Sequence, residues 1–137
     1  MKYFLLILFF SSCTEVRNDL LDKCHGEFII HKLYYKDKCL SCNGIYTLMI
    51  NKESDYIYIE NKTNNSIVKA NYKLYKSEKN EIYLDVFNSD SQIFNGDYII
   101  EFDTILNTIQ REEYKITIES NNVYMETYKT FIKKIGN

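Results

Sequence analysis

The sequence predicts a small all-β protein, an antiparallel up-and-down meander of about eight strands that closes into a barrel. Short runs of the chain alternate between apolar and polar residues with a period of two. The links between them are of hairpin length, whereas parallel strands need crossovers of a dozen or more residues. Thirteen Tyr, eight Phe and no Pro suit uninterrupted strands. Closure is expected because an open meander would leave exposed edges.

Eight alternating runs follow one another along the chain. They comprise residues 27–35, 45–50, 56–60, 67–75, 82–87, 98–103, 114–119 and 123–131. The clearest is 67–75, where Val68, Ala70 and Tyr72 alternate with polar residues. Alternation of this kind places apolar side chains on one face of a strand, so each run is expected to turn one face to the core.

The connections are rich in Asn, Asp and Ser, which replace the scarce Gly as turn formers. They comprise residues 51–55, 61–66, 77–80, 88–91 and 120–122. Asn and Asp tolerate left-handed backbone conformations and bond their own backbone, so they can reverse a chain. Residues 104–111 leave two alternatives open, a continued strand or a helical turn or loop.

In the first run the alternation predicts a division into two faces. Phe28, Ile30 and Tyr34 are expected on one face of the strand. Ile29, Leu33 and Tyr35 are expected on the other.

The N-terminal residues have the pattern of a secretory signal, so export is expected. Lys2 precedes the apolar run 4–10, which is much shorter than the roughly 20 residues of a transmembrane helix. The following stretch Phe10–Cys13 resembles the lipobox of bacterial lipoproteins, with two small residues before the cysteine. The resemblance implies that Cys13 becomes the lipid-bearing N-terminus of the mature protein. An ordinary secretory signal that happens to contain a cysteine is the alternative.

The chain is therefore expected to have three parts: a lipoprotein signal peptide over 1–12, a lipidated tether over 13–23, and a single β-domain over 24–137. Seventeen basic and nineteen acidic residues give a net charge of −2, which does not suggest a nucleic-acid partner. The expected location is the bacterial cell envelope, with membrane attachment through lipid on Cys13. Thr14 gives no acidic inner-membrane retention signal, which favours the outer membrane in a Gram-negative cell.

Short motifs also resemble those of lipocalins. Gly26-Glu27-Phe28 is similar to the Gly-x-Trp motif at the start of the first lipocalin strand, with Phe in place of Trp. Gly96-Asp97-Tyr98 resembles the Asp-Tyr motif before a later strand. The resemblance implies a barrel able to hold a small apolar ligand. It also implies that Lys133 and Lys134 stand near the first-strand aromatic residue.

Three cysteines remain after Cys13. A structural disulfide is favoured for an exported protein, with a zinc site or a redox pair as alternatives. If the run 27–35 is a straight strand of roughly 30 Å, Cys24 cannot reach the other two, and Cys39 would pair with Cys42. If that run bends, Cys24 can bridge to either. No metal or cofactor is expected.

The sequence favours a binding protein over an enzyme. Two histidines are few for catalysis, and no nucleophile elbow of the G-x-S-x-G type occurs. His31 lies in an alternating run and is expected to be a partly buried structural residue. One hypothesis is a carrier whose cavity is lined by Phe28, Tyr46, Leu48 and Tyr98. The alternative is a protein-partner module (an inhibitor, immunity or assembly lipoprotein) with a filled interior and an exposed aromatic patch.

Overall fold

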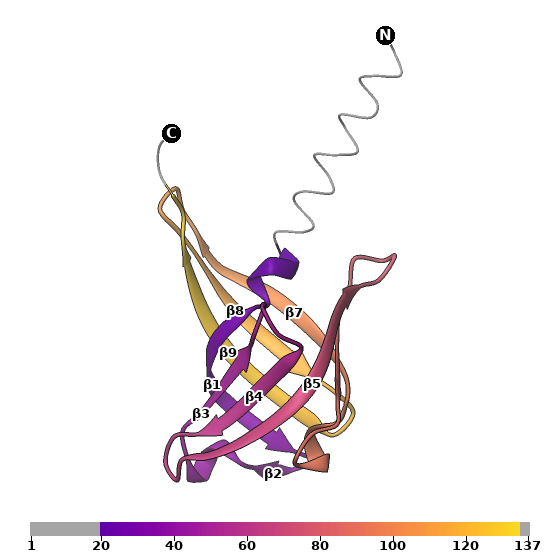
Figure 1. Cartoon of the computed structure of the whole chain (residues 1–137). Coiled ribbons are helices and arrows are strands. Elements are labelled where there is room, and N and C mark those ends of the chain that lie inside the picture. The colour runs from indigo at the N-terminus through magenta and orange to yellow at the C-terminus, as the bar shows by residue number, and fades with distance from the viewer. Residues whose placement is uncertain (1–19, 135–137) are drawn as a thin grey trace.

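The computed structural model describes residues 20–134, in which eight strands close into an antiparallel barrel and a ninth, very short strand pairs with the end of the first (Figure 1). The strands are β1 (Gly26–Tyr35), β2 (Lys38–Cys39), β3 (Tyr46–Ile50), β4 (Tyr56–Asn61), β5 (Ser66–Lys76), β6 (Ile82–Phe87), β7 (Gly96–Asn107), β8 (Arg111–Glu119) and β9 (Val123–Ile132). Two 3-10 turns, η1 (Ser41–Asn43) and η2 (Gln92–Phe94), lie in the loops.

The strands form a meander, because from β3 to β9 each pairs with the next along the chain. The barrel closes where β1 pairs with both β3 and β9. Strand β2 pairs antiparallel with the end of β1 alone, with Tyr34 opposite Cys39. The predicted fold class is therefore confirmed, and closure removes the open edges that a flat meander of this length would expose.

Period-two alternation places the core inside the barrel. In β6, for example, Ile82, Leu84 and Val86 are buried while Tyr83 and Asp85 are only partly covered. The largest fully buried side chains come from six different strands, and they include Phe28, Leu33, Leu48, Ile50, Leu84, Tyr98, Ile116, Ile118 and Val123. The interior is thus one continuous apolar core.

The predicted faces of the first strand are wrong beyond Ile30. The register of β1 against β9 shifts between Ile30 and Lys32, so an extra residue is inserted there. Leu33 consequently joins Phe28 and Ile30 in the core instead of facing away from them. A β-bulge changes which face the following residues occupy, and simple alternation does not anticipate it.

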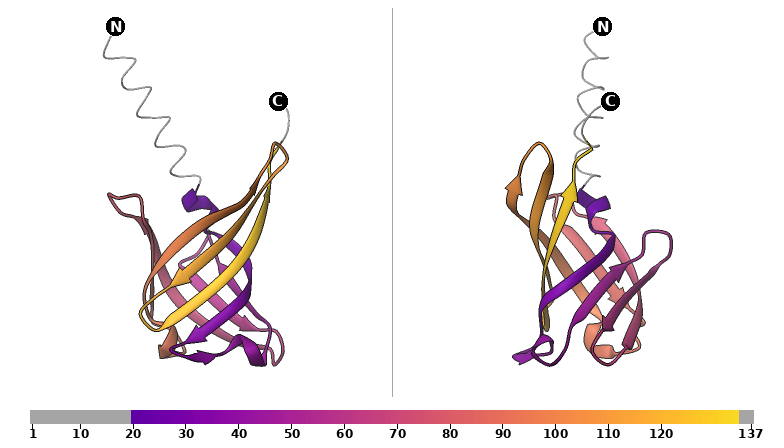
Figure 2. Two further views of the ribbon diagram at one scale, coloured as in Figure 1. Left: turned by 180° about the vertical axis from the view of Figure 1, so that it is seen from behind. Right: turned by 90° about the vertical axis from the view of Figure 1, so that its left-hand side faces the viewer.

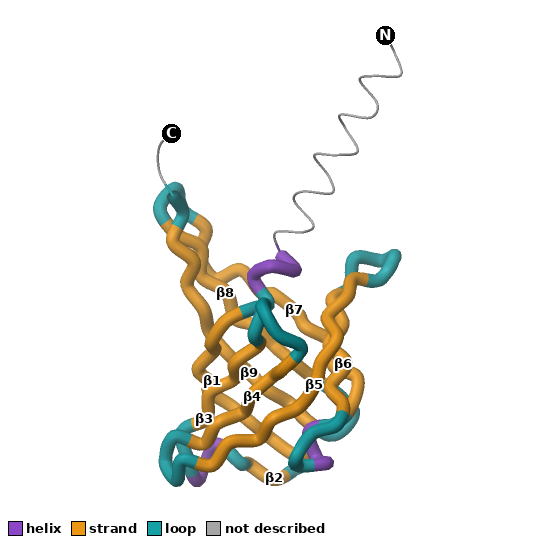
Figure 3. Tube along the Cα trace, viewed as in Figure 1, coloured by secondary structure: helices purple, strands orange, loops and turns teal. Residues whose placement is uncertain are grey.

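Residues 104–111 continue the sheet. Strand β7 extends to Asn107, and β8 begins at Arg111 after a tight turn in which the Thr108 amide donates to the Arg111 carbonyl over 2.9 Å. This hairpin projects beyond the barrel together with the end of β9 (Figure 2). The β5–β6 hairpin also projects at that end, as the trace in Figure 3 shows.

The described chain begins at the same end of the barrel. Residues 20–23 are helical and precede β1 (Figure 1). The predicted signal peptide over 1–12, the lipidation residue Cys13 and most of the tether lie outside the described residues. Within residues 20–134, no helix has the length and apolar character needed to cross a membrane.

Candidate functional site

Three of the four predicted ligand-lining residues are buried inside the barrel. Phe28 and Leu48 are register partners on β1 and β3, and both are buried. Tyr98 enters from β7, and its hydroxyl donates to the Phe94 carbonyl over 2.8 Å. Burial raises the pKa of Tyr98 to about 12, so the phenol stays protonated. Tyr46 is only half-buried.

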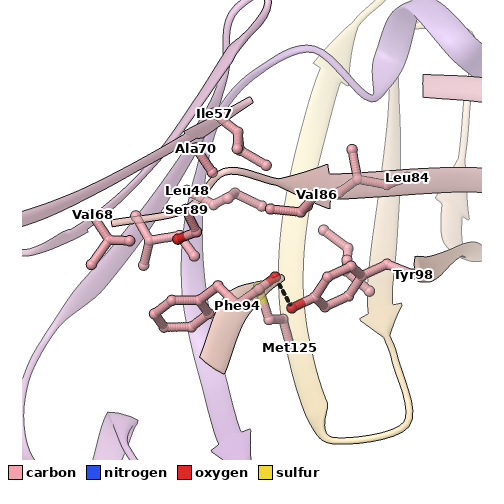
Figure 4. Close-up of a pocket in the computed structure, with 12 residues that line it drawn as sticks. Leu48, Ile57, Val68, Ala70, Leu84, Val86, Ser89, Phe94, Tyr98 and Met125 are labelled. Carbon is pink, nitrogen blue, oxygen red and sulfur yellow. Dashed lines mark hydrogen bonds between the residues drawn. The ribbon is translucent and has the colours of Figure 1, made fainter. Parts of the chain in front are cut away.

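The space beside Leu48 and Tyr98 is almost completely filled. The apolar cavity has a volume of about 10 Å³, and its lining includes Leu48, Ile57, Leu84, Phe94 and Tyr98 (Figure 4). A water molecule needs roughly 10–15 Å³, and an engineered cavity that binds benzene is about 150 Å³. This cavity therefore has no room for an organic ligand, and the buried side chains around it form a packed core.

The side chain of Phe94, which lies in a loop, helps to fill the interior of the barrel. It belongs to the short turn η2, is 5% exposed, and lines the cavity with Ser89 and Tyr98. The hydrogen bond from Tyr98 to the Phe94 carbonyl holds the turn against the barrel. Any ligand that entered the barrel on this side would have to displace Phe94.

An ion pair joins the chain before β1 to the start of β8, at the end of the barrel from which the chain enters. Lys23 Nζ lies 2.7 Å from Glu112 Oε2, and both side chains are largely covered. The same ammonium lies 5.5 Å from the ring centroids of Tyr114 and Phe131. The hydrogen bond from Lys23 lowers the pKa of Glu112, so the carboxyl is ionised at neutral pH. This arrangement pins the entering chain to β8 and β9.

The basic residue next to the first-strand aromatic is Lys129. Its Nζ lies 4.2 Å from the centroid of the Phe28 ring and donates to the Glu27 carbonyl over 2.9 Å. The expectation that Lys133 and Lys134 fill this role is wrong: Lys133 instead binds Asn107 and Glu112, and Lys134 is exposed. The reason is that β9 continues outward beyond Lys129 with the projecting hairpin, which carries its last residues away from Phe28.

Gly26 makes this contact possible. Its φ of +112° lies in a region that other residues rarely adopt. A Cβ at this position would approach Lys129 Nζ to 3.0 Å. Gly26 at the start of β1 therefore leaves the space in which Lys129 of β9 packs against Phe28.

The outer wall formed by β4–β7 carries two groups of aromatic and apolar side chains, which we call together the aromatic wall. Tyr56, Tyr58 and Phe87 form one group, and Tyr75, Tyr83 and Ile99 form the other. The charged row of Lys73, Asp85 and Asp97 lies between the two groups. Tyr75, Tyr83 and Ile99 are cross-strand neighbours, and the two tyrosine rings stack with centroids 5.5 Å apart. Lys69 Nζ lies 3.6 Å from the Tyr56 ring centroid. Tyr75 and Ile99 are 49% and 40% exposed, so this apolar surface is accessible.

A second cluster lies on the outer side of β8, β9 and β1. Glu126 is nearly buried there and accepts hydrogen bonds of 2.9 Å from both Tyr124 and Tyr128. Lys32 and Lys115 lie 3.8 and 4.0 Å away. Burial opposes ionisation, yet the tyrosine hydroxyls and lysines hold the pKa of Glu126 below its ordinary value of 4.5. The carboxylate is thus satisfied within the protein and ties β9 to its neighbours.

His31 and the cysteines occupy structural positions. His31 is exposed at the β1 bulge, and its ring meets Tyr128 edge to face at 5.0 Å, so the prediction of a partly buried ring is wrong. Cys39 and Cys42 form the predicted local disulfide, with Cα atoms 5.5 Å apart across η1. Cys24 is buried and is the free cysteine of the described chain, and burial raises its pKa to about 12. The bonded sulfurs are not available as zinc ligands in this state.

The sequence pattern did not predict that the residues of the aromatic wall lie on one face. It also did not predict the hydrogen-bonded cluster around Glu126. The wall appears only once the register aligns residues from four strands. The Glu126 site has no sequence signal, because the residue occupies an ordinary outward position of an alternating strand.

Comparison with protein-family models, curated proteins and solved structures gave no match for this chain. The structural class of the protein is therefore defined by its geometry alone. It is a closed, eight-stranded, up-and-down barrel with a packed interior and an aromatic outer wall.

Proposed function

We propose that this protein is a non-enzymatic lipoprotein of the bacterial cell envelope that binds a protein partner through the aromatic wall. We prefer a protein partner to a small-molecule ligand because the interior is filled. A cavity of about 10 Å³ leaves no space for a small molecule. The lipobox resemblance at Phe10–Cys13 supports the anchor. The pairing of Phe28 with a basic residue supports a lipocalin-like relationship of the barrel.

The composition of the aromatic wall suits protein recognition. Aromatic side chains are enriched in the centres of protein interfaces, where Tyr combines a large contact area with a polar end. Stacking of Tyr75 on Tyr83 limits the motion of both rings, so less conformational entropy is lost when a partner covers them. Lys69 lies over the Tyr56 ring, and Lys73, which lies between the two groups of the aromatic wall, approaches the Phe87 ring, so both supply charged groups for a partner.

The carrier hypothesis requires a different conformation. Phe28, Leu48 and Tyr98 do face the interior, but they occupy it themselves. An apolar ligand would enter only if Phe94 left its place in the lining. The partner hypothesis needs no such rearrangement, and we prefer it for that reason.

Intact-mass analysis and site-specific photo-cross-linking in the native cell test the proposal. We expect a mature chain that begins at acylated Cys13 and carries no stoichiometric small molecule. A photoreactive residue at Tyr75 should cross-link to one defined protein, and Tyr83→Ser should weaken that adduct. A photoreactive residue at Tyr128, which is similarly exposed on the opposite wall, is the control.

Each readout can contradict one part of the proposal. An unprocessed chain would overturn the anchor. A co-purifying apolar molecule would favour the carrier hypothesis. Equal adducts from both walls, or none from Tyr75, would remove the assignment of the aromatic wall.

A further inference from the structure

The hairpin that projects from the barrel ends in exposed isoleucines. Ile105, Ile109 and Ile132 are 55%, 82% and 76% exposed, and we call them the isoleucine tip. Ile109 lies in the turn between β7 and β8, and Ile132 is the register partner of Arg111 at the start of β8. All three therefore lie on the projecting β7–β8–β9 extension, away from the core (Figure 2).

The other projecting hairpin differs in character. The turn between β5 and β6 consists of Ser77, Glu78, Lys79, Asn80 and Glu81. Two loops thus extend from the same end of the barrel (Figures 1 and 3). The β5–β6 turn is polar throughout, whereas the β7–β8 turn exposes Ile109 between Thr108 and Gln110. Exposed apolar groups at a projecting tip are unfavourable in water and favourable in an apolar environment.

The described chain begins between the two projecting hairpins, because Leu20 lines one surface hollow with Asn80 and Glu81 while Lys23 contacts the start of β8. Lys23 is bound to Glu112 of β8 at 2.7 Å, so residues 20–23 are held against the base of the extension. Cys13 precedes Leu20 by seven residues, and an extended chain spans at most about 3.6 Å per residue, or about 25 Å in total. Lipid attached to Cys13 must therefore lie within about 25 Å of the end that carries the isoleucine tip.

We propose that the isoleucine tip inserts into the surface of the lipid bilayer that holds the anchor. This inference rests on the proposed lipidation of Cys13. The tip and the acyl chains form two attachment points, and together they orient the barrel, whereas a single flexible tether would leave it free to turn. With the tip in the bilayer, the opposite end, which carries η1 and η2, is directed away from the membrane (Figure 1).

The charges around the tip indicate that the contact is apolar and does not select anionic lipids. Arg111 lies 3.4 Å from Glu113, and Lys133 lies 3.7 Å from Glu112, so much of the local positive charge is neutralised within the extension. Lipid insertion through Ile side chains depends on the apolar area that is buried. Zwitterionic phosphatidylcholine vesicles are therefore a sufficient probe.

The absence of tryptophan from the sequence allows a clean test. The lipidated full-length mature protein is reconstituted in phosphatidylcholine vesicles as Ile109→Trp. The matched control is Ile45→Trp, because Ile45 is 62% exposed just before β3, at the opposite end of the barrel. We expect the emission of Ile109→Trp to shift to the blue and to lose most of its intensity with brominated phosphatidylcholine. Ile45→Trp should show neither change.

The outcomes separate the tip from the anchor, because intact mass reports lipidation independently. A lipidated protein whose Ile109→Trp emission resembles that of Ile45→Trp overturns the tip contact and leaves the anchor in place. A blue shift without quenching by brominated lipid means that protein covers the tip, which also overturns the inference. A chain without lipid on Cys13 overturns both the anchor and the orientation argued from it.

Discussion

Lys129 Nζ lies 4.2 Å above the Phe28 ring and donates to the Glu27 carbonyl, which joins the last strand of the barrel to the first. The two residues are about a hundred positions apart in the chain, and their contact lies at the seam where β1 and β9 close the barrel. A cation over an aromatic face adds stability beyond the apolar area that is buried. Closure is therefore reinforced by a specific interaction as well as by backbone pairing.

Lys129→Met tests the contribution of this contact. The substitution keeps much of the apolar stem and removes the charge, so the free energy of unfolding should fall by about 1–2 kcal/mol in urea titrations. Lys69→Met removes a comparable contact with Tyr56 at an exposed site and should cost under about 0.5 kcal/mol. Equal losses in the two variants would contradict a special role for the seam.

The Lys23–Glu112 pair should make stability depend on pH. The pKa of Glu112 is lowered in the folded protein, so its contribution is complete above the unfolded value of about 4.5 and is lost as the pH falls through the lower folded pKa. At pH 7 we expect Glu112→Gln to destabilise the protein by about 1 kcal/mol. That difference should disappear in acid, and thermal unfolding between pH 3 and 7, as a rough range set by the ordinary carboxyl pKa, measures it. A difference that does not change with pH would contradict this assignment.

The three cysteines of the β-domain should fall into two groups by their reactivity towards iodoacetamide. Cys24 is buried with a raised pKa, so it should not be alkylated in the folded protein. Unfolding without reduction should expose one thiol, Cys24, and subsequent reduction should add Cys39 and Cys42. Mass spectrometry counts the labels on the mature chain. Rapid alkylation in the folded state would mean that the environment of Cys24 opens readily.

Removal of the Cys39–Cys42 bond should destabilise the protein without unfolding it. The bond closes a very short loop, and the chain-entropy relation gives about 2 kcal/mol for a loop of this size. The double variant Cys39→Ser/Cys42→Ser should therefore retain its β-sheet circular dichroism and unfold at a lower urea concentration. Loss of the folded state would show that β2 and η1 contribute more to the barrel than their length suggests.

Creating space inside the barrel should create a ligand site. Leu48 is fully buried, so Leu48→Ala should cost about 3 kcal/mol and leave an apolar cavity. Benzene should raise the melting temperature of this variant but not that of the natural protein. Ile67→Ala, at an exposed position, should show neither effect. Stabilisation of the natural protein by benzene would show that its interior opens in solution. That result would favour the hypothesis that the barrel carries a small apolar ligand.

The local pattern of residues was sufficient to predict most of the fold. Alternation identifies the eight barrel strands, and in Ile82–Phe87 it also identifies the side chains that face the core. Hairpin-length connections rich in Asn and Asp predict the meander. The spacing of Cys39 and Cys42 on the far side of a strand from Cys24 predicts their pairing. These predictions succeed because they depend on residues that are close together in the chain.

The candidate site depended on relationships that no local pattern contains. The bulge after Ile30 moves Leu33 into the core, and the length of β9 places Lys129, not Lys133, against Phe28. Whether Phe28, Leu48 and Tyr98 line a cavity or fill one depends on the combined volume of side chains from many strands. The sequence by itself thus determined the strands and their order. Only the tertiary structure decided which residues meet across the closed barrel, because register and packing are set by all strands together.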